Sequence, residues 1–480
     1  MMQTINSKLR FNVAFGSTLY LAIVATLIIV FVAIPETEAI ASANQYRHEA
    51  AKLRAQYESS EGNDLSFSEV SGLDGYLAYA ALHNPGLRSA YYNWIAQLKR
   101  AGYVGALPDP QLTYSYYIEN VETRVGPQEH RVGLRQLFPW FGTLGSHKDI
   151  ALESANAAYQ HYRSLKLALF YRVKKTYFDY YYLGKQIQLT DDNIKLLKLW
   201  ESVARTEYKA ALRRYPDVLK AQVELGMLSD RLETLTARKE PVVARLRSAL
   251  NLPSDTPIPL PTSIPYVETA VDREVILKLV SENNPDITSL FHQVERQLAA
   301  ERLAGKASYP NLTLGVDYVG VGEAINPLLS ESGKDSWSIN VGLNLPIWPG
   351  KNKARKNEAR AKLREARYAL SEKENDIIEI AEQVLFKHED ALRKIRLYRD
   401  GLVPKAHQSL NAESTAYEAG ETNFLNLLDA QRLLLDFELK LDLAVTELAR
   451  SQAELVALTG RAYEATDSND DPTPEPGSDR

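Results

Sequence analysis

The sequence contains no cysteine among its 480 residues. Disulfides, thiolate metal sites, a cysteine nucleophile and a lipid carried on an N-terminal cysteine are therefore excluded. Histidine is also scarce, and the eight histidines show no metal-ligand spacing. Because neither a glycine-rich phosphate loop nor a nucleophile–base pair is recognisable, the sequence predicts no cofactor, no bound metal and no enzyme activity.

An excess of basic charge is missing as well. The 56 Lys and Arg residues are outnumbered by 61 Asp and Glu residues, which gives a net charge of −5 with the two signs interspersed. Proteins that follow a phosphate backbone need a basic stripe. Nucleic acid is therefore not an expected partner.

Long hydrophobic runs are almost absent. The one clear apolar stretch, Leu19–Ile34, is sixteen residues long, which is short of the ~20 residues of a spanning helix. It follows Lys8 and Arg10 and precedes small residues, the arrangement of a secretory signal peptide over residues 1–41. An uncleaved anchor is the alternative. The candidate cleavage sites are Ala39, Ala41 and Ala43.

The segments before and after the two repeats are expected to lie outside the folded core. Residues 42–64 form an N-terminal extension, and residues 464–480 are acidic and rich in Pro and Ser. A segment of that composition has too little apolar surface to pack, so a disordered tail is predicted.

The chain does contain an internal repeat. Asn84-Pro85 recurs as Asn284-Pro285, and "QLFPWFG" recurs as "NLPIWPG". Further on, "YKAALRRYPDVLKAQ" is matched by "YEAGETNFLNLLDAQ". A spacing that drifts only from 200 to 209 residues indicates duplication. We therefore expect two repeats built on one plan, 65–264 and 265–463.

Each repeat carries two stretches in which apolar and polar residues alternate with period two, as in a two-faced strand. A soluble sandwich fits the alternation equally well. Two hairpins among long helices, however, leave few strands to pair with, and an open sheet edge is not tolerated in lipid. If the strands span a membrane, several chains must share one barrel. The expected strands are about 111–119, 129–138, 311–319 and 336–345.

Long helical hairpins are predicted after each strand pair, at about 146–250 and 351–459. Their first helices run for about 65 residues, or roughly 100 Å at the rise of an α-helix. Pro404 is the expected irregularity in the second one. The apolar stripes of these helices are interpreted as packing surfaces.

The doubled Asn-Pro openings, strand hairpins, "LFPWFG"/"LPIWPG" junctions and turns before Ala-Gln resemble the TolC family of outer-membrane efflux proteins. The resemblance covers about Leu65 to Gly460. It implies a mainly α fold with a small β part: a long α-helical barrel of two coiled hairpins per chain, joined to a trimeric twelve-stranded outer-membrane β-barrel with four strands per chain. The helical part would lie in the periplasm.

The function that this resemblance implies is passive conduction from the periplasm to the exterior in a tripartite efflux system. The expected partners are two further copies in a homotrimer, a periplasmic adaptor (membrane fusion) protein, an inner-membrane pump such as an RND transporter or ABC exporter, and outer-membrane lipid. The substrate stays open between drugs, heavy-metal cations and secreted proteins. The alternatives are a type I protein-secretion duct and a soluble periplasmic coiled-coil structural or adaptor protein.

The resemblance also assigns candidate site residues. Asn426 and Asp429 match two acidic residues that narrow the periplasmic entrance, so one acidic ring becomes an amide. Three Asp429 carboxylates around one axis would favour cations, although Asp429 also fits an ordinary solvated helix position. The closed-state linkage would use Tyr417 and Asp217, but Thr422 stands where the family has arginine. Arg213 and Arg214 are possible substitutes for that arginine.

The adaptor is expected to dock on the two hairpin turns. These are Ala211-Leu212-Arg213 in the first repeat and Gly420-Glu421-Thr422 in the second. Only the second turn contains a glycine, the residue that best tolerates a left-handed backbone.

Overall fold

The computed structural model describes residues 39–62, 67, 72–210, 214–326 and 330–461. The chain divides into two units, Met1–Ala55 and Gln56–Arg480, and helix α2 (Ala39–Gly62) crosses the boundary between them. The remaining elements belong to the second unit. Almost all of the expected signal peptide and the whole of the expected acidic tail lie outside the described residues, so both stay predictions.

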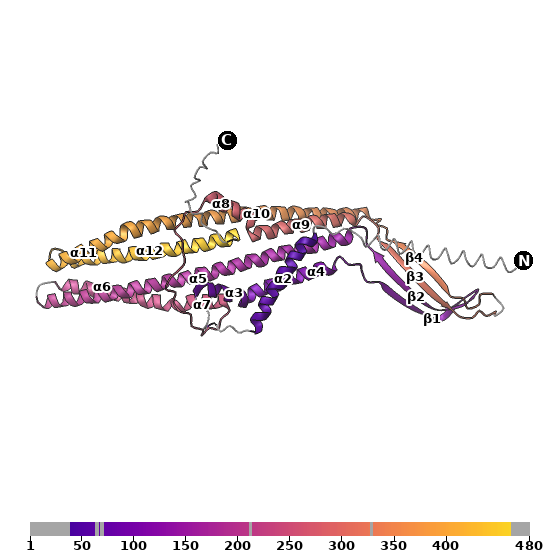
Figure 1. The fold of residues 1–480 in the computed structure, drawn as a ribbon, viewed down its shortest axis with the longest axis horizontal. Helices are drawn as coiled ribbons and strands as arrows, with labels where there is room; N and C mark the ends of the chain where they lie inside the picture. Colours follow the sequence, from indigo (N-terminus) through magenta and orange to yellow (C-terminus); the bar gives the residue numbers. More distant parts are fainter. Residues whose placement is uncertain (1–38, 63–66, 68–71, 211–213, 327–329, 462–480) are drawn as a thin grey trace, which may run out of the picture. The chain divides into compact units, whose positions relative to one another are not determined.

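The two repeats fold in the same order of elements (Figure 1). The first contains α3 (Gly72–His83), α4 (Pro85–Tyr103), β1 (Gln111–Thr123), β2 (Gly126–Phe138), α5 (Thr143–Lys209), α6 (Tyr215–Ala237) and α7 (Lys239–Leu250). The second contains α8 (Arg273–Asn283), α9 (Pro285–Lys306), β3 (Leu312–Val321), β4 (Ser336–Leu343), α10 (Pro349–Arg396), the π-helix η2 (Leu397–Leu402), α11 (Val403–Ala419) and α12 (Phe424–Thr459). The boundary expected at 264/265 falls in the connection 251–272, which has neither helix nor strand.

The long helices pack lengthwise against one another (Figure 1). Helix α5 is 67 residues long, about 100 Å, and contacts α6, α9 and α12 along its course. One apolar cluster joins α5, α6, α11 and α12 through side chains such as Ile194, Ala221, Leu410 and Leu427. No helix in the described ranges is both long and apolar enough to cross a membrane.

Proline interrupts both repeats after the long first helix. The irregularity expected at Pro404 is confirmed, because the chain passes through η2 just before it and Val403 N donates to Tyr398 O. The returning part of the first hairpin is interrupted at Arg238, between α6 and α7. Pro241 has no N–H with which to bond the carbonyl of Ala237, four residues earlier.

Gly184 lies in the middle of α5 for a packing reason. A Cβ placed on it would come 2.6 Å from Cδ2 of Leu260 in the connection 251–272. The same connection accepts a hydrogen bond from Tyr180 of α5 at Ile258 O (3.3 Å) and one from Gln452 of α12 at Val267 O (2.6 Å). The connection therefore ties a helix of the first repeat to one of the second.

The strands form one antiparallel sheet in the order β1-β2-β3-β4. One face is apolar and exposed, with Leu112 73% and Ile339 73% accessible. On the other face Asp317 is only 1% accessible and pairs with Arg131 at 2.8 Å. Gly133 gives this carboxylate room, since a Cβ there would lie 2.3 Å from Asp317 Oδ1. The predicted alternation of two unlike faces is thus confirmed.

The asparagine of the repeated Asn-Pro phrase links the start of one helix to the end of the last helix in each repeat. Asn84 accepts a hydrogen bond from Leu87 N at 3.1 Å and donates to Ala249 O at 3.0 Å. Asn284 likewise caps α9, and it donates to Leu458 O at 2.9 Å. Each asparagine therefore caps a helix start and satisfies a carbonyl at the end of the last helix of its repeat, a group that has no partner within its own helix.

Candidate functional site at the turns of the helical hairpins

The turn between α11 and α12 is built from backbone rules. Gly420 has φ +79°, Gly420 N donates to Tyr417 O at 3.1 Å, and Glu421 N donates to Ala416 O at 2.8 Å, which together make a Schellman motif. Asn423 then caps α12 by accepting from Leu425 N (2.9 Å) and Asn426 N (3.1 Å). The glycine expected to suit a tight turn does so.

The turn between α5 and α6 is only partly described. Ala211, Leu212 and Arg213 lie outside the described residues, so their predicted docking and gate roles stay predictions. Arg214 is the extended N-cap of α6, and its carbonyl accepts a hydrogen bond from Asp217 N at 3.2 Å. Asp217 is half-buried in the first turn, where a carboxylate is favoured by the helix dipole.

An aromatic pair spans each turn at repeat-equivalent positions. The rings of Tyr417 and Phe424 are 5.6 Å apart, and both residues are buried in the core. The rings of Tyr208 and Tyr215 are 5.2 Å apart, but these residues are 45% and 50% exposed. The two turns therefore differ chemically: the second is closed by an apolar core, and the first presents a tyrosine pair to its surroundings.

Residues assigned to two different roles come together in the second turn. Asn426, an expected aperture residue, donates from Nδ2 to Oγ1 of Thr422, the expected gate residue, at 2.9 Å. Asn426 lies exposed in the first turn of α12, and Thr422 lies half-buried just before the N-cap of this helix, whereas Tyr417 is in the core. Thr422 thus orients the Asn426 amide instead of supplying the charge of an arginine.

Asp429 has a cationic neighbour that the sequence interpretation missed. Arg432 lies one turn further along α12, 3.4 Å from Asp429 Oδ1, and it also bonds Glu224 of α6. Glu224 is 7% exposed, and its hydrogen bond raises the pKa of Arg432. Asp429, Glu224 and Arg432 together therefore carry a formal charge of −1. The sequence signals were the i,i+3 spacing of Asp429 and Arg432 and the position of Glu224 in line with buried Ala221 and Leu228.

The repeated Ala-Gln phrase supplies amide bridges between helices. Gln222 of α6 donates to Glu201 of α5 at 3.0 Å, and Gln431 of α12 donates to Asn193 of α5. Both glutamines thus reach the same helix, α5. The second bridge joins the two repeats near the turns.

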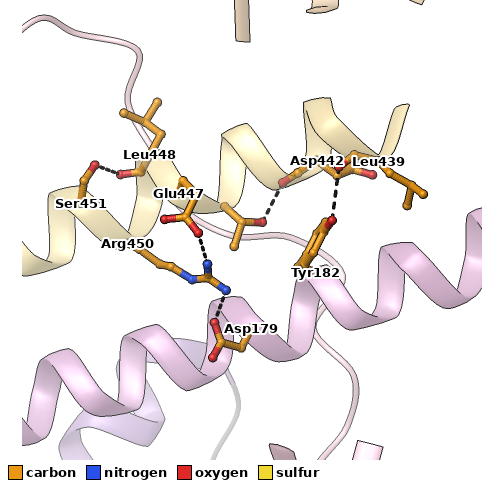
Figure 2. Close-up of polar contacts among 9 residues, drawn as sticks. Asp179, Tyr182, Leu439, Asp442, Glu447, Leu448, Arg450 and Ser451 are labelled. Carbon is orange, nitrogen blue, oxygen red and sulfur yellow. Dashed lines mark hydrogen bonds and ion pairs between the residues drawn. The ribbon is translucent and has the colours of Figure 1, made fainter. Parts of the chain in front are cut away.

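Further from the turns, a polar seam joins α5 to α12 (Figure 2). Arg450 of α12 bridges Asp179 of α5 and Glu447 of its own helix. Tyr182 donates to the backbone carbonyl of Leu439 at 3.5 Å (Figure 2). The two hairpins are thus held together by side chains that project from facing helix surfaces.

Two carboxyl groups beside this seam are partly desolvated. Burial raises the pKa of Asp442, and Lys185 opposes that rise. Burial also raises the pKa of Glu438, while His407, 3.4 Å away, opposes it. Within the described residues no group of three or more His, Asp or Glu side chains is arranged to hold a metal ion. The site is a set of helix-to-helix contacts.

Comparison with known proteins identifies this architecture. The family model of the outer membrane efflux proteins matches residues 276–461, which is most of the second repeat. The second repeat of this chain is thus similar to the outer membrane efflux proteins. The first repeat lies outside the matched residues, and its elements follow the same order as those of the second. Members of this family are channel proteins.

Individual relatives support the assignment over more of the chain. Nodulation protein T of Rhizobium leguminosarum bv. trifolii is 23% identical over 75% of this chain and 78% of its own length. The toluene efflux pump outer membrane protein TtgI of Pseudomonas putida is 27% identical over 71% and 73%. The crystal structure of the outer membrane protein VceC of Vibrio cholerae aligns with a TM-score of 0.67 at 17% identity, covering 82% of this chain and 97% of that one. The chain thus shares its fold with a solved outer membrane protein.

Proposed function

We propose that this efflux protein is the outer-membrane exit channel of a tripartite system, working as a homotrimer with a periplasmic adaptor and an inner-membrane pump. The channel would conduct passively and catalyse no reaction. The observation that carries the proposal is the sheet: it has one exposed apolar face, and in the described residues β1 and β4 each pair on one side only. Three copies would pair those edges and close a twelve-stranded barrel in the outer membrane.

The second repeat would supply the periplasmic aperture. Asn426 and Asp429 lie exposed on the first two turns of α12, one helical turn apart. Around a three-fold axis they would give a ring of amides and a ring of carboxylates. Arg432, which pairs with both Asp429 and Glu224, would moderate the cation preference of the carboxylate ring.

The gate would differ from the arginine-based linkage of the family. Thr422 is bonded to Asn426, so the closed state would depend on Tyr417, Asp217 and the basic residues of the first turn, Arg213 and Arg214. The half-buried position of Asp217 at the start of α6 supports this assignment. Substitution of Asp217 by Asn should raise basal conductance if the carboxylate holds the aperture closed.

Adaptor tips would dock on the turns 211–213 and 420–422. The exposed Tyr208 and Tyr215 next to the first turn support a docking role there, because exposed tyrosine pairs are typical of binding surfaces. In the second repeat, the turn that begins at Gly420 would present a rigid docking surface to the adaptor. The substrates would be small drugs, solvents or heavy-metal cations, and the pump would select among them.

Conductance in planar bilayers tests the proposal. Purified trimer should form ion-conducting channels, and Asp429→Asn should reduce cation preference measured from reversal potentials in a salt gradient. Pure trimer that inserts but never conducts would overturn the channel function. A protein-secretion duct would instead restore the export of a secreted protease in cells that lack their own duct. A soluble adaptor would fractionate without the outer membrane.

A further inference from the structure

A cavity of about 380 Å³ lies where β4 passes into α10. Lys306 of α9 and Lys351 and Arg355 of α10 line it, together with His147 of α5. Within the part of the chain that the structure describes, no carboxylate lines this cavity. Three cationic side chains around one cavity whose lining contains no carboxylate favour the binding of an anion.

Lys306 is held in place by the backbone around it. Its Nζ donates to Gly142 O at 2.5 Å and to Ser146 Oγ at 2.8 Å. Gly142 has φ +70°, and a Cβ on it would lie 2.7 Å from Nζ. The ammonium group is therefore fixed by neutral acceptors, and its charge remains available to a ligand.

Lys351 and Arg355 are four residues apart and lie on one side of α10. The next carboxylate along the helix, Glu358, lies outside the cavity lining and forms its ion pair with Lys362 at 2.6 Å; Lys362 and, more weakly, Arg355 lower the pKa of Glu358. The first turn of α10 contains no acidic residue, so the positive end of the helix dipole adds to these two charges. Guanidinium and ammonium groups combined in this way are suited to phosphate oxygens.

The surroundings of the cavity are apolar and aromatic. Leu345, which lines it, is 68% exposed and continues the apolar face of β4, and Ile347 and Trp348 are 65% and 68% exposed. Tyr309, also in the lining, stacks on Trp140 with ring centroids 4.9 Å apart. Basic side chains next to Trp and Tyr, at the end of an apolar strand face, are typical of the headgroup level of a membrane.

We propose that this cavity binds the phosphate of an anionic phospholipid headgroup from the periplasmic leaflet, with the acyl chains lying along the apolar face of β4. The inference rests on the proposed function, because it requires the sheet to lie in the outer membrane. It gives the chain, which has no cysteine to carry a lipid, a non-covalent contact with the membrane.

Native mass spectrometry of the detergent-purified trimer tests this site. Short-chain phosphatidylglycerol, titrated below its micelle concentration, should bind with up to one molecule per chain, and short-chain phosphatidylcholine should bind more weakly. K351Q/R355Q should weaken phosphatidylglycerol binding by roughly thirtyfold, as expected for the loss of two cationic contacts. K353Q/K356Q is the matched control, since it removes the same charge from the same two turns of α10 outside the cavity lining.

Equal weakening by both double variants, or none by K351Q/R355Q, would overturn the site. Displacement of phosphatidylglycerol by inorganic phosphate at equal concentration would also overturn it, because the cavity would then be a general anion site. Conductance of the wild-type trimer, recorded in parallel, tests the proposed function separately: a conducting trimer without selective lipid binding refutes the lipid site alone.

Discussion

Replacing Asn284 by Ala should loosen the junction at which the second repeat closes on itself. The Asn284 side chain accepts from Asp286 N (3.0 Å) and Ile287 N (3.3 Å) and donates to Leu458 O (2.9 Å), and the residue is 3% exposed. Loss of the cap costs about 1 kcal/mol. Leaving a buried carbonyl unpaired costs a further ~1–3 kcal/mol. The local free energy of opening should therefore fall by about 2–4 kcal/mol.

Hydrogen exchange of the detergent-solubilised protein measures this directly. In N284A, peptides covering the start of α9 should exchange roughly thirtyfold to several-hundredfold faster than in wild type, at about 1.4 kcal/mol per tenfold. N284D keeps the cap acceptor but replaces the donor to Leu458 O with a carboxylate oxygen that repels this carbonyl, so it should expose the end of α12 more than the start of α9. N84A should produce the same loosening at Leu87 and leave the second repeat unaffected.

Two results would refute this reasoning. One is wild-type exchange at the start of α9 in N284A, which would mean that the cap and the carbonyl bond contribute nothing. The other is a uniform increase over the whole chain, which would mean that Asn284 acts on global unfolding and not on the junction.

Three further predictions follow from single contacts. Gly184→Val should lower the free energy of unfolding by about 1–3 kcal/mol, the usual cost of overpacking, because the new side chain meets Leu260. The thermal midpoint should fall accordingly, and it should fall less in Gly184→Ala. Arg432→Ala should destabilise by roughly 1–3 kcal/mol, since it leaves Glu224 buried and unpaired, and it should increase the cation preference of the channel; unchanged selectivity would contradict the pairing. Glu438→Gln should raise the thermal midpoint at pH 7, and the gain should shrink as the pH falls towards ~4; a constant gain would contradict it.

The sign of the Glu438 prediction follows from burial. Because burial raises the folded-state pKa of this carboxyl above its unfolded value, protonation favours the folded state, and that stability is present below the unfolded pKa of ~4.3. It is lost as the pH rises through the folded pKa. At neutral pH the ionised carboxylate therefore destabilises the folded state, and a neutral amide at this position removes that destabilisation.

Much of this architecture could be predicted from local signals. Period-two alternation around Ile339 and helical stripes without proline are properties of neighbouring residues, and the duplicated Asn-Pro phrase is visible without any structure. The left-handed turn at Gly420 and the interruption before Pro404 follow equally from the backbone chemistry of single residues. These features depend on short-range geometry, which the order of residues already contains.

The contacts that define the candidate site depend on which helices become neighbours. Arg432 was not recognised because its buried partner Glu224 is 208 residues away in sequence. The cluster around Lys306, Lys351 and Arg355 joins the end of α9 to the start of α10 only after a strand hairpin has intervened between them.

The sequence by itself therefore determined the repeat, the strand faces and the positions of the turns, since each depends on periodicity or on one residue's backbone preference. Only the tertiary structure decided that Asn84 and Asn284 reach Ala249 and Leu458, that Gly184 makes room for Leu260, and which charges are compensated. The physical reason is that hydrogen bonds, steric contacts and ion pairs act over a few ångströms in space, and distance along the chain does not specify which residues come that close.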